Sequence, residues 1–75
     1  MVLGRPVTQE DSGEFLGSVS GVLLHPDKGN VEGFFVDSQE GGNLFLSSLD
    51  VRRLTTALVV RGPWVLSEPQ DIIRV

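Results

Sequence analysis

Short apolar runs separated by turn residues are the feature that most constrains how this chain folds. The runs recur at close spacing along the chain, and nine glycines and four prolines lie mostly between them. This pattern is typical of an all-β sandwich or barrel. The sequence therefore predicts a small all-β barrel of about six mostly antiparallel strands. The strands are expected near residues 5–7, 15–24, 31–37, 43–46, 57–60 and 64–66.

Glycine and proline also predict where this barrel bends and turns. Gly17 and Gly21 lie inside the longest predicted strand and suggest a bulge or a bend, which helps a small sheet to curl. Residues 25–30 read His-Pro-Asp-Lys-Gly-Asn. A proline that fixes φ, followed by a glycine that accepts the left-handed conformation, indicates a tight hairpin. Residues 39–42, with two glycines, indicate a second hairpin loop.

Two short helical segments are predicted besides the strands. Ser47, three residues before Asp50, resembles the capping box of a single helical turn. Ser67, followed by an acidic residue and by Pro69, resembles the N-terminus of a helix. We therefore divide the chain into one domain, residues 1–66, and the start of a C-terminal helix or linker, residues 67–75, which we expect to continue in a longer protein.

The chain has few means of stabilisation apart from packing. It has 75 residues, no cysteine and one histidine. Disulfides and thiolate or histidine-rich metal sites are therefore not expected, and we predict no cofactor. A domain of this size has a small core and often gains stability from association. Either the packing is very efficient or another chain covers part of the surface.

Charge and hydropathy argue against several function classes. The net charge is −4 and the six basic residues are scattered, so a nucleic-acid partner is not expected. Arg52 and Arg53, the one adjacent basic pair, are interpreted as solvated surface. No apolar run approaches the ~18 residues that span a bilayer, and residues 1–4 do not resemble a signal peptide. We expect a cytoplasmic protein without a membrane span.

Candidate catalytic groups are few. His25 directly precedes the turn proline, and turn geometry explains its position without a role as a base. Glu10 and Asp11 are adjacent carboxylates in a predicted loop, where such pairs are usually solvated. No glycine-rich phosphate loop is present. We therefore predict that the domain is not an enzyme.

Several predicted strands carry apolar side chains on both faces. A half-buried strand alternates apolar and polar residues, because successive side chains point to opposite sides. The exceptions are the continuous apolar runs at residues 22–24, 34–36, 44–46 and 58–60. A small barrel has one interior, so the outward members of these runs need cover from elsewhere.

The outward residues predict a surface that contacts protein. Glu32 lies two residues before Phe34, and its charge suggests that this face of the strand is the outer one. The side chain of Phe45 points to the opposite face of its strand from those of its two leucine neighbours, which also places it outside. Trp64 lies beside a turn. We predict Phe34, Phe45 and Trp64 as protein-interface residues. Either the chain's own continuation after Ser67 or a separate partner, including a second copy in a homodimer, would cover them.

Four motifs follow one another at characteristic spacing along the chain. They are Gly-Arg-Pro-Val at residues 4–7, Leu-Gly-Ser-Val at 16–19, Val-Leu-Leu-His-Pro-Asp-Lys-Gly-Asn-Val at 22–31 and Leu-Ser-Ser-Leu-Asp-Val at 46–51. In order and spacing the sequence resembles the PRC-barrel family from about Leu3 to Val65. The resemblance implies a compact β-barrel of the kind found in the H subunit of the photosynthetic reaction centre, in a ribosome maturation factor and in stand-alone bacterial and archaeal proteins.

The same resemblance implies an adaptor that docks onto other proteins. Two departures bear on how far it extends: Ser20 and Gly21 stand where members often have an acidic residue, and His25 stands where many have an acidic residue before the turn proline. Both weaken a proton-uptake role like that of the reaction-centre subunit. The leading expectation is a non-catalytic protein-interaction module. The alternatives are a module of RNA metabolism and a regulator of electron transport, the latter by fold analogy alone.

Overall fold

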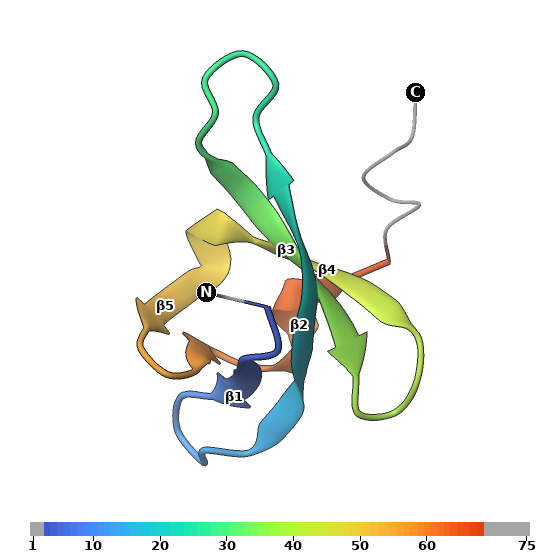
Figure 1. Ribbon diagram of the computed structural model, residues 1–75. Helices are drawn as coiled ribbons and strands as arrows, with labels where there is room; N and C mark the ends of the chain where they lie inside the picture. The colour runs from blue at the N-terminus through green and yellow to red at the C-terminus, as the bar shows by residue number, and fades with distance from the viewer. Residues whose placement is uncertain (1–2, 69–75) are drawn as a thin grey trace.

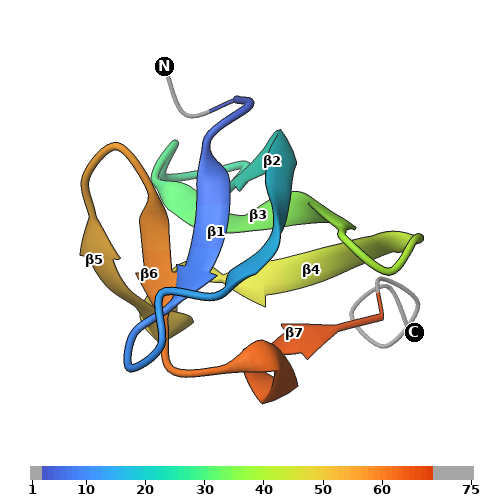
Figure 2. The ribbon, with the colours of Figure 1, turned by 90° about the horizontal axis from the view of Figure 1, so that it is seen from below.

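The computed structural model describes residues 3–68, which fold into one strongly curled sheet of seven strands. The strands are β1 (Pro6–Gln9), β2 (Phe15–Leu24), β3 (Val31–Ser38), β4 (Asn43–Ser47), β5 (Val51–Leu54), β6 (Leu58–Val60) and β7 (Leu66–Ser67). They lie in the order β5-β6-β1-β2-β3-β4-β7. All neighbours are antiparallel except β1 and β6, which are parallel. Figure 2 shows the sheet curving into a half-barrel.

The predicted all-β class is confirmed, and so is the short helical turn after the fourth strand. That turn is a 3-10 helix, η1 (Ser48–Asp50), and the Ser47 hydroxyl caps it by accepting the Leu49 N–H at 3.2 Å. Within residues 3–68 the two helical segments are both 3-10 turns, and none is long and apolar enough to cross a membrane. The C-terminal helix predicted beyond Ser67 falls mainly on residues 69–75, which lie outside the described part of the chain.

Two elements differ from the predicted ones. β5 adds a strand directly after η1, where the sequence predicts only the helical turn. Residues 63–65 form a second 3-10 turn, η2 (Pro63–Val65), where the sequence predicts the start of the last strand. The reason is Pro63, because its fixed φ and missing N–H suit the first position of a helical turn. The last strand is therefore reduced to the two residues of β7.

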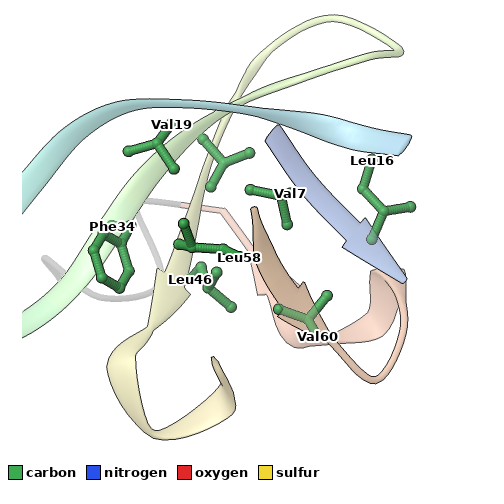
Figure 3. Close-up of a cluster of buried hydrophobic side chains, with 8 residues drawn as sticks. Val7, Leu16, Val19, Phe34, Leu46, Leu58 and Val60 are labelled. Atoms are coloured by element: carbon green, nitrogen blue, oxygen red, sulfur yellow. The ribbon is translucent and has the colours of Figure 1, made fainter. Parts of the chain in front are cut away.

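The core fills the concave side of the curled sheet. Every strand from β1 to β4 and β6 contributes to it, and Figure 3 shows these side chains converging from several strands. The cluster consists of Val7, Leu16, Val19, Phe34, Val36, Leu46, Leu58 and Val60. Burial of this apolar surface is the main stabilising contribution of the fold, at about 25 cal/mol per Å².

Two bulges let the long strand β2 bend around this core. Thr8 pairs with Phe15 and Val7 pairs with Gly17, so Leu16 has no partner on β1. On the other side, the partners of Val19 and Gly21 are consecutive on β3, so Ser20 is the extra residue there. A bulge bends its strand and increases the local twist. The bulge or bend that Gly17 and Gly21 predict is therefore a bulge in both places, and the extra residue is the one that precedes each glycine.

The β2–β3 hairpin extends beyond the rest of the sheet (Figure 1). Its tip is closed by His25, whose backbone N–H donates to the carbonyl of Asn30 at 2.8 Å. The imidazole Nδ1 of His25 also accepts the backbone N–H groups of Asp27 and Lys28, both at 3.1 Å. Gly29 has a φ of +74°, as the predicted turn requires. His25 thus acts as a local cap that satisfies two turn amides.

His25→Ala is expected to destabilise the domain by about 1 kcal/mol, because two backbone N–H groups lose their side-chain acceptor. His25→Asn is the matched control, since an asparagine oxygen can accept hydrogen bonds from amides two and three residues ahead. Urea unfolding of the two variants measures the difference. Equal losses in both variants would show that the acceptor has no part in stability.

Candidate functional site

The three predicted interface residues lie in three different environments. Phe34 is 5% exposed, Phe45 is 8% exposed and Trp64 is 73% exposed. Phe34 belongs to the inner core, Phe45 to the convex face of the sheet and Trp64 to η2. The structure therefore does not bring them together into one surface, and Trp64 alone is available for contact.

The prediction that Phe34 faces outward is wrong. Phe34 pairs with Val22 on one side and with Leu46 on the other, and all three contribute to or pack against the inner core. The misleading residue is Glu32, which has no partner on β2 because Leu23 pairs with Gly33 and Leu24 with Val31. This bulge interrupts the alternation. The exposed charge of Glu32 therefore says nothing about the face of Phe34.

Phe45 does face the convex side, as predicted, but the chain covers it with its own residues. It pairs with Phe35, and the two rings meet edge to face with centroids 5.7 Å apart and planes at 68°. The Phe45 ring also lies directly over Gly33, where a Cβ atom would overlap it. Its burial is a consequence of packing on the domain's own sheet. Nothing in this arrangement requires a partner.

Trp64 projects from η2 into a shallow hollow on the surface. Its ring packs against Gly62, which is buried and has no room for a Cβ atom. The rest of the indole faces solvent beside Leu49, which is 92% exposed at the tip of η1. We call the residues around this hollow the Trp64 surface, which comprises Leu49, Asp50, Arg52, Arg61, Trp64 and Val65.

The Trp64 surface carries two arginines on an acidic chain. Arg52 and Arg61 contribute two positive charges and Asp50 one negative charge. Arg52 also lies 3.4 Å from a carboxylate oxygen of Glu10, with both side chains about half exposed. An exposed ion pair of this kind is worth roughly 0–1 kcal/mol and leaves the arginine free to exchange partners. Tryptophan and arginine are among the residue types most enriched at the residues that dominate binding in protein interfaces.

A second hollow lies on the other side of η2, where the half-barrel is open. Its volume is about 250 Å³. Phe15, at the start of β2, is largely exposed in it, and the loop between β3 and β4 forms the opposite wall. We call it the Phe15 hollow, and its principal lining residues are Glu14, Phe15, Glu40, Leu44, Pro63 and Leu66. The charged groups on its lining are the two carboxylates, and no basic residue accompanies them.

Within residues 3–68 no polar or charged side chain is buried, and no group of three or more histidine or acidic side chains is placed to hold a metal ion. His25, the single imidazole, lies at the hairpin tip and uses Nδ1 for its own turn. The described surface presents exposed aromatic and aliphatic groups beside charged ones, with two carboxylates at the Phe15 hollow and two arginines and a carboxylate at the Trp64 surface.

Sequence reasoning missed Leu49 and Phe15. Leu49 stands between Ser48 and Asp50 in a capped turn. Because it belongs to no alternating strand pattern, its position was the available signal that this leucine is exposed. Phe15 pairs with Thr8 on β1 and is largely exposed, whereas the next residue, Leu16, is buried in the core. Simple alternation along the start of the strand was the available signal for it.

No protein-family model matches this sequence, and no curated protein matches it either.

Proposed function

We propose that this domain is a non-catalytic protein-interaction module that binds its partner through the Trp64 surface. The observation that carries the proposal is the exposure of Trp64 and Leu49 in one hollow. A large aromatic and a leucine are costly to leave in water together, at about 25 cal/mol per Å². Their association with Arg52 and Arg61 supports a contact surface that also selects its partner by charge.

A PRC-barrel type of adaptor is the finer form of this proposal. The curled all-β sheet and the motif order at residues 4–7, 16–19, 22–31 and 46–51 support it. The partner is a protein, and a second copy of the chain is included among the candidates. The acidic net charge of −4 favours a protein over a nucleic acid.

The test is affinity capture from the source cell with the wild-type chain and with Trp64→Ala as bait. Leu24→Ala is the matched control, because Leu24 is also an exposed apolar residue but lies on the projecting hairpin. We expect a specific protein to be captured by the wild type and by Leu24→Ala and to be reduced at least about tenfold by Trp64→Ala, the scale of an interface hot spot. An endogenous copy of this chain counts as such a protein. Equal capture by all three baits would contradict the proposal.

A further inference from the structure

The Trp64 surface and the Phe15 hollow adjoin each other along η2. Pro63 lines the Phe15 hollow, and the next residue, Trp64, lines the Trp64 surface. One segment of three residues therefore presents a projecting indole on one side and an open apolar hollow on the other. Figure 2 shows this segment as the short coil directly before β7, at the edge of the sheet.

The two surfaces carry charged groups that can pair with one another. The Phe15 hollow carries Glu14 and Glu40 without a basic residue, whereas the Trp64 surface carries Arg52 and Arg61 beside Asp50, and Arg52 can exchange its exposed contact with Glu10 for a partner's carboxylate. We infer that two copies of this chain pair reciprocally, the Trp64 surface of each copy seated on the Phe15 hollow of the other. The inference rests on the proposed function and identifies the protein partner as a second copy of the chain.

Charge complementarity distinguishes a second copy from other occupants. An acidic segment of another protein would satisfy the Trp64 surface and leave the Phe15 hollow open, and a basic segment would do the reverse. A second copy related by a two-fold axis engages both surfaces at once, and each contact occurs twice. The arginine–carboxylate contacts gain directionality because guanidinium and carboxylate groups pair through two parallel hydrogen bonds.

The size of the Phe15 hollow also favours a second copy of the chain as its occupant. A hollow of about 250 Å³ is smaller than the pockets of roughly 300–1,000 Å³ that hold cofactors and small molecules. It suits a side chain such as an indole, and Phe15, Leu44 and Leu66 provide apolar contacts for the ring. A standard interface of about 800 Å² per partner would take about a sixth of the 5006 Å² surface. Association would also stabilise a domain whose own core is small.

The experiment uses two charge-reversed variants of the full chain. E14R/E40R makes the Phe15 hollow basic, and R52E/R61E makes the Trp64 surface acidic. Each variant then has two surfaces of the same sign, so we expect each to lose self-association by at least about tenfold in dissociation constant. Mixing the two variants restores opposite charges at both contacts, so the mixture is expected to dimerise with nearly wild-type affinity. D27R/E32R, with the same charge change as E14R/E40R but on the hairpin, is the matched control for that variant and is expected to dimerise normally.

Two measurements determine how strongly each variant dimerises and whether Trp64 lies in the interface. Sedimentation velocity over a range of concentrations gives the dissociation constants. Trp64 is the single tryptophan of the chain, so its emission should shift to shorter wavelength and become less accessible to acrylamide as the dimer forms. Urea unfolding of each variant confirms that it is folded before association is compared.

Three results would overturn the inference. The first is a wild-type chain that remains monomeric up to millimolar concentration. The second is a dimer whose Trp64 emission equals that of the monomer. The third is a mixture of the two folded variants that does not associate. If Trp64→Ala abolishes capture of a different protein while the wild type stays monomeric, the reciprocal dimer is refuted and the proposed function stands.

Discussion

Leu46→Ala is expected to destabilise the domain by about 2–5 kcal/mol and to leave a large fraction of the molecules unfolded at 37 °C. Leu46 is 0% exposed and lies where β3, β4 and β7 meet, paired with Phe34 and Leu66. Its removal leaves a cavity that the strands on both sides cannot close. Native domains have a total stability of about 5–15 kcal/mol, and a core of this size places the chain at the lower end. Thermal and urea unfolding followed by circular dichroism measure the loss.

Leu49→Ala is the control for this prediction, because it makes the same chemical change three residues away. Leu49 is 92% exposed on η1, so its truncation leaves no cavity and should change stability by less than about 0.5 kcal/mol. The same variant is expected to weaken binding through the Trp64 surface. Comparable destabilisation in the two variants would contradict the placement of Leu46 in the core.

Gly33→Ala is expected to destabilise the domain by about 1–3 kcal/mol, although the backbone of Gly33 is ordinary strand. A Cβ atom at this position would overlap the Phe45 ring and lie 2.6 Å from the carbonyl oxygen of Leu46. The ring can move only by giving up its contact with Phe35. The carbonyl belongs to the adjacent strand β4 and cannot move without disturbing the β3–β4 pairing. Urea unfolding measures the effect.

Gly21→Ala is the matched control, because Gly21 is also a strand glycine beneath an aromatic ring. A Cβ atom on residue 21 would lie 3.3 Å from the Phe35 ring. Its three nearest neighbours are all side-chain atoms of Phe35, and none is a backbone atom. Phe35 is partly exposed and can shift slightly. Replacing glycine by alanine also restricts the unfolded chain, which stabilises by about 0.4–1 kcal/mol where the folded state tolerates the methyl group. We expect a change close to zero, and a loss equal to that of Gly33→Ala would exclude the close approach of β4 as the cause.

The candidate site was only partly accessible from the sequence. The sequence indicates Trp64 because a large aromatic stands beside a turn, and the structure leaves it exposed. Phe34 was placed on the wrong face because its orientation was inferred from Glu32 by simple alternation. A bulge at Glu32 shifts the count by one, and a shift of one residue moves every later side chain to the other face. Gly33 directly follows Glu32, in the same way that Gly17 follows Leu16 and Gly21 follows Ser20, and it is the available signal of this bulge in the sequence.

The Phe15 hollow depended on tertiary structure throughout. Its lining comes from β2, the β3–β4 loop, η2 and β7. These segments are far apart in the chain, and they meet only because the sheet curls and stays open at one side. No local sequence pattern predicts that these distant segments come together. The two carboxylates of this hollow and the two arginines of the Trp64 surface were seen to lie near the same segment, η2, only once those segments were placed.

The sequence by itself determined the all-β class, the interruption of the long strand next to Gly17 and Gly21, the hairpin at residues 25–30 and the helical turn capped by Ser47. Each of these depends on local conformational preferences, which act over a few neighbouring residues and are readable from them. Tertiary structure alone decided which phenylalanines lie inside, how far the barrel closes and which exposed groups share a surface. These depend on strand register and on contacts between distant segments. Such contacts arise from the summed packing of the whole chain.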